Sequence, residues 1–215
     1  MATRKRRRPN KKKSFLQQLQ LRMRKQEPDF KPDAKVATFA KTTRLTKQQQ
    51  LRLGKWALYT LTVILCLVVQ DVLMGQLNFL GATTDLAVSA ILLITVIEGT
   101  EVGSLFVLIA STLYYFSGSA PGAYSIGLMS VLGIAAVLFR QMYLHRSKGS
   151  IVLCAGLAQL GYEIGLLAVG LFEGLTLVNR AYSFVLTGVY GILTMLPLYP
   201  LIYKIGLIGG NTWKE

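Results

Sequence analysis

Residues 56–74 read WALYTLTVILCLVVQDVLM, an apolar run that carries no charge before Asp71. A helix rises about 1.5 Å per residue and the hydrocarbon core of a bilayer is about 30 Å thick, so roughly 17–25 apolar residues can cross it. Further apolar segments follow along the chain at Ala82–Ile97, Val102–Phe116, Gly122–Leu144, Ile151–Phe172 and Tyr182–Ile208. The pattern predicts an all-α fold, a polytopic membrane bundle of about six transmembrane helices.

The second and third segments are short for a full membrane span. Only Glu98-Gly99-Thr100-Glu101 separates them. They are expected to form either a tight hairpin or one broken helix, and irregular backbone at membrane depth needs protein or water to cover it.

Charge divides the chain into two parts. Residues 1–55 hold 18 Lys and Arg against three acids, a net +15, whereas residues 56–215 hold six against seven, a net −1. We therefore predict a basic cytoplasmic tail over 1–55, largely disordered, followed by a transmembrane domain over 56–210. Such asymmetry is typical of proteins that contact membranes or nucleic acids, and it argues against a soluble enzyme.

The distribution of basic residues also predicts the orientation. If the tail is cytoplasmic and six helices follow, 23 of the 24 Lys and Arg residues lie inside and only Arg180 lies outside. Basic loops remain on the cytoplasmic side of bacterial membranes. The expected topology has both the N-terminus and the C-terminus in the cytoplasm.

The tail begins with a dense basic cluster, RKRRRPNKKK at residues 4–13. Clusters of this kind attract anionic lipid when they lie near a membrane. Residues 14–26, SFLQQLQLRMRKQ, place apolar side chains at roughly helical spacing, so an amphipathic interfacial or docking helix is one possibility there. A solvated tail that only enforces topology is the alternative, and no nucleic-acid-reading module is recognisable.

The residues needed for most catalysis are missing. The chain has one histidine, His145, and it lacks a zinc-protease helix motif, a phosphate-binding glycine loop and paired-cysteine spacing. We therefore predict no enzyme activity, no catalytic residue, no metal site and no cofactor.

Carboxyl groups at membrane depth are costly and mark functional positions. Asp71 and Asp85 are expected near the outer ends of their helices, whereas Glu163 falls near the middle of the fifth segment. Gly161 and Gly165 form a G-x-x-x-G pair in that segment, which lets helix backbones approach closely. A partner contact and a satisfied interior hydrogen bond are both open for Glu163.

The order of these features resembles the MreD family of rod-shape-determining membrane proteins over residues 56–210. The resemblance rests on short motifs, which are Thr84-Asp85-Leu86, Gly99-Thr100-Glu101-Val102-Gly103, Ser117-Gly118, Pro121-Gly122 before a helix that reaches Arg140, Tyr162-Glu163, and Leu196-Pro197-Leu198-Tyr199-Pro200-Leu201. Two departures are Tyr114-Tyr115-Phe116, where the family usually has an acid, and a longer basic tail.

The resemblance implies a non-catalytic scaffold in the bacterial plasma membrane that acts in cell elongation. It would link MreB-like filaments and an MreC-like protein to peptidoglycan synthases, with anionic lipid bound by the tail and no small-molecule substrate. The candidate partner-contact residues are Asp85, Gly161, Tyr162, Glu163, Gly165, Arg140, Arg146 and Lys148.

The alternative is the substrate-binding subunit of an energy-coupling-factor vitamin transporter, which also has about six helices and no ATPase motif. Such subunits need polar groups that converge on the outer side of the membrane. The candidates for that role are Gln70, Asp71, Gln76, Asn78 and Asn179.

Overall fold

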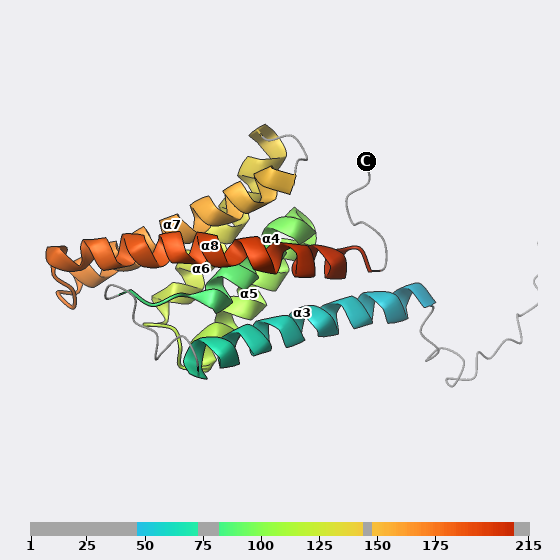
Figure 1. Cartoon of the computed structure of the whole chain (residues 1–215), viewed down its shortest axis with the longest axis horizontal. Helices are drawn as coiled ribbons and strands as arrows, with labels where there is room; N and C mark the ends of the chain where they lie inside the picture. The colour runs from blue at the N-terminus through green and yellow to red at the C-terminus, as the bar shows by residue number, and fades with distance from the viewer. Residues whose placement is uncertain (1–46, 73–81, 144–147, 209–215) are drawn as a thin grey trace, which may run out of the picture. The chain divides into compact units, whose positions relative to one another are not determined.

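The computed structural model describes residues 47–72, 82–143 and 148–208. The described residues form six α-helices and one short 3₁₀ helix, which Figure 1 traces along the chain. In order they are α3 (Lys47–Val72), α4 (Leu86–Glu98), α5 (Thr100–Phe116), α6 (Tyr124–Tyr143), α7 (Lys148–Phe172), η2 (Val178–Arg180) and α8 (Ala181–Gly206). The expected all-α class is confirmed for these residues, and the region expected to hold an amphipathic helix, 14–26, lies outside them.

Each predicted apolar segment coincides with a helix, and the helix starts differ most from the predicted ones at α3 and α4. The first, α3, begins at Lys47, so residues 47–55 of the predicted tail are helical. Lys, Gln, Leu and Arg are strong helix formers, but a hydropathy pattern registers only the apolar part of a helix. The second, α4, begins at Leu86 rather than Ala82, with Asp85 at its N-cap and the N–H of Ala87 bound by Gln70 of α3.

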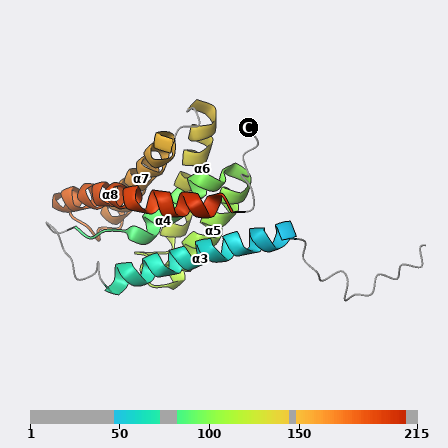
Figure 2. The ribbon, with the colours of Figure 1, turned by 45° about the vertical axis from the view of Figure 1, so that its right-hand side comes forward.

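Helix α4 is the centre of the bundle. It contacts α3, α5, α6, α7 and α8, and it lies among the other helices in both views of the ribbon (Figures 1 and 2). Every residue from Ala87 to Glu98 is buried. A helix that is apolar on all sides can be stable only when protein or lipid surrounds it. Here the other five helices provide that surrounding.

Helices α4 and α5 form a hairpin, which decides between the two arrangements that the sequence allowed. Gly99 joins them with a φ of 88°, a left-handed conformation that glycine adopts without strain. Beyond the turn the two backbones touch, because a Cβ at Gly103 would lie 2.3 Å from the carbonyl oxygen of Thr95. Only glycine fits at that crossing.

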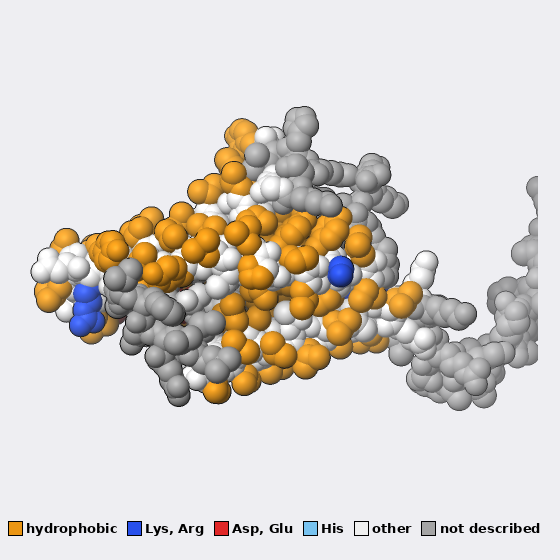
Figure 3. Space-filling view, in the orientation of Figure 1, with side chains coloured by type: hydrophobic (Ala, Val, Ile, Leu, Met, Phe, Trp, Pro, Cys, Tyr) orange, Lys and Arg blue, Asp and Glu red, His pale blue; other side chains and the backbone are white. Residues whose placement is uncertain are grey.

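The outer faces of the long helices are apolar. On α3 the side chains of Leu61, Leu65 and Val68 are more than half exposed, and the face seen in Figure 3 is mostly hydrophobic over the described residues. Water-soluble monomers rarely expose apolar patches beyond a few hundred Å². Four helices, α3, α6, α7 and α8, are long and apolar enough to cross a membrane, which is the composition expected of a polytopic helical membrane protein.

Glycines let α7 and α8 pack closely. A Cβ at Gly156 of α7 would lie 3.1 Å from Ile192, and a Cβ at Gly188 of α8 would lie 2.8 Å from Leu160. Small residues at helix crossings of this kind are typical of membrane bundles. The packing fixes the position of Glu163 against α8, since the Cγ of Glu163 is also within 3.4 Å of that Gly188 position.

Candidate functional site

Polar side chains gather at the two ends of α4, near Asp85 and near Glu98. The Asp85 end is the region where α4 begins, and the Glu98 end is the region where it stops. Each end holds charged groups that the apolar bundle must stabilise with specific partners.

At the Asp85 end, Gln70 of α3 holds the start of α4. Its Nε2 donates to Asp85 Oδ1 at 3.2 Å, and its Oε1 accepts from the backbone N–H of Ala87 at 2.9 Å. Asp85 makes no side-chain bond to its own helix. Gln70 therefore satisfies a free N–H at the helix start, leaving the Asp85 carboxyl available for other contacts.

One of those contacts is with Glu163 of α7. The two carboxyl groups lie within electrostatic reach of each other, and both line the same cavity. The Glu163 Oε1 accepts from Gln159 Nε2 at 3.3 Å, and the Glu163 side chain is 2% exposed. Two carboxyl groups at one site disfavour the state in which both are ionised, and a nearby cation relieves their repulsion.

Tyrosines surround this carboxyl pair. Tyr114 is buried and its hydroxyl donates to the carbonyl oxygen of Ser119 at 3.3 Å. Tyr162 is fully buried and lies within electrostatic reach of both carboxyls. The side chain of Ser125 is a neighbour of the Tyr162 hydroxyl. That hydroxyl forms no hydrogen bond with the described residues.

A cavity of about 480 Å³ opens beside the carboxyl pair. Its wall combines the two carboxyls with one basic, several hydroxyl and several apolar side chains. The lining residues are Thr83, Asp85, Tyr114, Ser119, Pro121, Tyr124, Glu163, Leu166, Gly170, Leu175, Thr176, Arg180, Ser183, Phe184 and Thr187. The Asp85 end is thus a concave, mixed polar and apolar site, the usual form of a ligand-binding pocket.

At the Glu98 end, a buried ion pair joins α3 to α4. Lys55 Nζ lies 2.6 Å from Glu98 Oε1, with the two side chains 5% and 1% exposed. The same oxygen accepts from the hydroxyl of Tyr59 at 2.5 Å, while Glu98 Oε2 has no partner among the described residues. A carboxylate at a helix C-terminus is disfavoured by the helix dipole, so Lys55 provides the charge that stabilises it.

Arg140 of α6 binds at this same end. Its Nη1 donates at 2.6 Å to the carbonyl oxygen of Val96, in the last turn of α4. A cation there satisfies a carbonyl that the helix itself leaves free. Of the other basic candidates, Arg146 and the side chain of Lys148 lie outside the described residues.

Gly161 and Gly165 face α6 of the same chain. A Cβ at Gly161 would lie 3.2 Å from Leu132, and one at Gly165 would lie 2.7 Å from Leu128. Contact between these glycines and a partner protein stays a prediction, and it would require α6 to move away.

The structure thus joins three of the candidates, Asp85, Tyr162 and Glu163, in one cluster and places Arg140 at the opposite end of α4. Reasoning from the sequence missed the pairing of Lys55 and Tyr59 with Glu98, although their i, i+4 spacing puts the first two on one helix face. Among the outer polar candidates for the transporter reading, Gln70 contacts Asp85 and Asp71 accepts from Ser119 at 3.1 Å.

Within the ranges that the structure describes, no three His, Cys, Asp or Glu side chains lie close enough together to hold a metal ion. Both cysteines, Cys66 and Cys154, are free and buried. No protein-family model, curated protein or solved structure matches this chain.

Proposed function

We propose that the protein is a non-catalytic membrane scaffold similar to MreD, which acts in bacterial cell elongation. The observation that carries the proposal is the position of the MreD-like motifs. Thr84-Asp85-Leu86 begins the central helix, Gly99–Gly103 forms its hairpin to α5, and Ser117-Gly118 follows α5. The motifs therefore coincide with the helix start and the turns that set the path of the chain.

The arrangement of the helices supports a scaffold rather than an enzyme or a channel. The middle of the bundle is filled by α4, whose side chains are buried from Ala87 onward. The apolar side chains of α3 are directed outward instead, with Leu61 and Leu65 each more than half exposed. Such a molecule presents apolar side chains on its lateral surface, where partner transmembrane helices can pack against them.

The proposed topology has both termini in the cytoplasm. Four long helices cross the bilayer, and the hairpin of α4 and α5 adds either two crossings or none. The total is even in both cases, so the two ends of the described bundle lie on the same side. The distribution of Lys and Arg favours the cytoplasm as that side.

In this proposal the basic tail, residues 1–55, contacts anionic lipid and MreB-like filaments, while the outer helix faces bind an MreC-like protein and cell-wall synthases. The exposed face of α3 is the first surface to test, because α3 is held to the bundle mainly by α4 and contacts α8 less. Its other side is therefore open to a partner.

The experiment is site-specific photocrosslinking in the native membrane, followed by mass spectrometry. A photoreactive residue is placed at Leu61, which is exposed, and separately at Tyr59, which is fully buried two residues away. The proposal expects an MreC-like protein or a cell-wall synthase from Leu61 and nothing from Tyr59. The same photoreactive residue is also placed at the exposed positions Leu65 and Val68. Recovery of lipid alone from all three exposed positions would reject α3 as the partner face.

The cavity at the Asp85 end favours a second candidate, the substrate-binding subunit of a vitamin transporter. A volume of about 480 Å³ with polar lining falls in the range of small-molecule sites. This candidate predicts that a transmembrane coupling subunit and paired ATPases are recovered with the protein. The scaffold predicts that they are absent and that cell-elongation proteins are recovered.

A further inference from the structure

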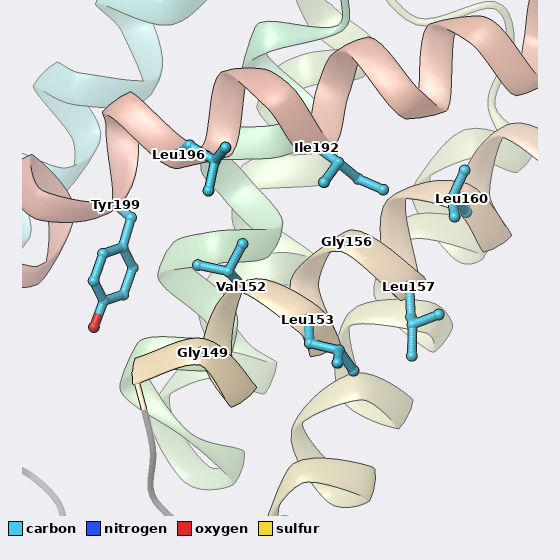
Figure 4. A pocket seen from close by; sticks show the side chains of 9 residues that line it. All are labelled: Gly149, Val152, Leu153, Gly156, Leu157, Leu160, Ile192, Leu196 and Tyr199. Carbon is cyan, nitrogen blue, oxygen red and sulfur yellow. The ribbon is translucent and has the colours of Figure 1, made fainter.

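The cavity at the Asp85 end is lined by polar groups whose hydrogen-bonding capacity is not fully used within the described bundle. Its volume of about 480 Å³ compares with roughly 300–1,000 Å³ for small-molecule sites. Two other hollows are almost wholly apolar, the groove between α7 and α8 in Figure 4 and a groove between α3 and α5. Lipid chains can fill these without any specific chemistry, whereas the cavity at the Asp85 end presents specific polar groups.

The first of these groups is the Asp85–Glu163 pair, whose two carboxyls both line the cavity. No basic side chain among the described residues forms an ion pair with either carboxyl. A negative charge shielded from water and without a cation is costly, and a positively charged group beside it removes much of that cost. The inner wall of the cavity therefore favours a cation.

The second observation is independent of charge. Thr176 lines the cavity, and its buried Oγ1 has no hydrogen-bond partner in the described part of the chain. Buried hydroxyls without partners are rare in native proteins and often mark the position of a ligand or water. A primary ammonium group has three N–H donors, and this oxygen can accept one of them.

The rest of the wall narrows the ligand further. Arg180 of η2 lines the cavity and is exposed, so it can bind an anionic group at the opening. The rings of Tyr114, Tyr124 and Phe184 and the side chain of Leu166 provide the aromatic and apolar part of the lining. Aromatic faces also favour a neighbouring cation.

We propose that this cavity binds a small zwitterion, with a protonated primary amine at the Asp85–Glu163 pair and an anionic group at Arg180. Two sources offer this chemistry, a free amino-acid-like molecule and the ethanolamine phosphate headgroup of a lipid. The proposal does not rest on the scaffold function, because its test is direct binding to the purified full-length chain. Loss of partner proteins and loss of amine binding are therefore separate results.

The test uses two probes that differ in a single group. The full-length protein is placed in phosphatidylcholine nanodiscs and titrated calorimetrically with 6-aminohexanoate or with 6-hydroxyhexanoate, which has a hydroxyl in place of the amine. We expect saturable binding of the amine and binding of the hydroxyl compound that is weaker by about tenfold or more, the usual scale for one charged hydrogen-bonded contact.

Substitutions then test whether the amine contacts the Asp85 and Glu163 carboxyls. Glu163→Gln and, separately, Asp85→Asn are expected to weaken the amine by about tenfold or more. The matched control is Glu173→Gln, which alters an exposed carboxylate in the turn after α7 that does not line the cavity, and it should bind like the native chain. Emission of Trp56, packed against Tyr59 and Phe106 at the far end of α4, reports whether each variant is folded.

Three results would overturn the proposal, namely no binding of the amine, equal binding of the two probes, and native affinity in both folded carboxyl variants. A further titration distinguishes the source of the ligand. If phosphatidylethanolamine in the nanodisc weakens 6-aminohexanoate binding, the headgroup occupies the cavity. If it does not, the natural ligand is a soluble zwitterion.

Discussion

Removing the positive charge of Lys55 isolates the contribution of the buried ion pair at the Glu98 end. In Lys55→Met the apolar stem is kept, but the Glu98 carboxylate loses a partner 2.6 Å away while its side chain remains 1% exposed. Breaking a buried pair in this way typically costs about 3–5 kcal/mol. The hydrogen bond from Tyr59 to the same carboxylate oxygen remains, so the lower part of that range, about 3 kcal/mol, is expected.

The measurement is thermal unfolding of the purified protein in detergent, followed by the emission of Trp56, which packs on Tyr59 at 5.8 Å between ring centroids. For a chain of this size about 1 kcal/mol corresponds to roughly 2–4 °C in Tm, so a loss of about 6–12 °C is expected. Lys204→Met is the matched control, because Lys204 is exposed on α8, and its Tm should change by less than about 2 °C.

A second substitution tests the cause. In Lys55→Met combined with Glu98→Gln, the uncompensated charge is gone and the amide can still accept from Tyr59, so most of the lost stability should return. If the double variant is no more stable than Lys55→Met alone, packing of the lysine stem rather than charge accounts for the effect. A Lys55→Met protein with native Tm would refute the reasoning altogether.

Three further substitutions or deletions follow from the geometry. Gly103→Ala places a Cβ 2.3 Å from a backbone oxygen and should lower Tm sharply, whereas Gly127→Ala, with no atom within 4 Å, should leave it unchanged or raise it slightly. Gln70→Leu removes the bonds to Asp85 and to the first turn of α4 and should cost about 1–3 kcal/mol in denaturant unfolding, while Gln70→Glu keeps the acceptor for the Ala87 N–H but places a second carboxylate against Asp85 and should cost more. Deletion of residues 2–46 should weaken association with membrane filaments without preventing membrane insertion, as measured by fractionation and cell shape; unchanged association and shape would reject a role for the tail.

The number and order of the helices could be predicted from the sequence, because the length of an apolar run directly limits what it can form. The ends of the helices were less predictable, since residues 47–55 are polar yet helical. The α4–α5 hairpin was one of two alternatives. Its decisive feature, the contact of Gly103 with the backbone at Thr95, depends on how two helices cross and leaves no mark in the hydropathy pattern.

The polar clusters show where such prediction stops. Asp85 and Glu163 were each identified as costly carboxyls, but they lie on different helices far apart in sequence, and nothing in the spacing indicates that they meet. Glu98 was placed in the short segment between two apolar runs, and it is the last residue of α4, buried against Lys55. Pairing between distant helices is a property of the packed bundle, so it becomes visible only in three dimensions.

The complete burial of α4 also has a consequence for how the protein is made. The helix is only about 20 Å long at 1.5 Å per residue, and its Ser89 hydroxyl donates to the carbonyl oxygen of Gly191 in α8 at 3.1 Å. During synthesis α4 leaves the ribosome before α8 has been made. Until then, lipid or the insertion machinery must cover the face of α4 that later packs against α8. Assembly of the core therefore waits for α8, and a chain stopped before Gly191 leaves the face of α4 that packs against α8 uncovered.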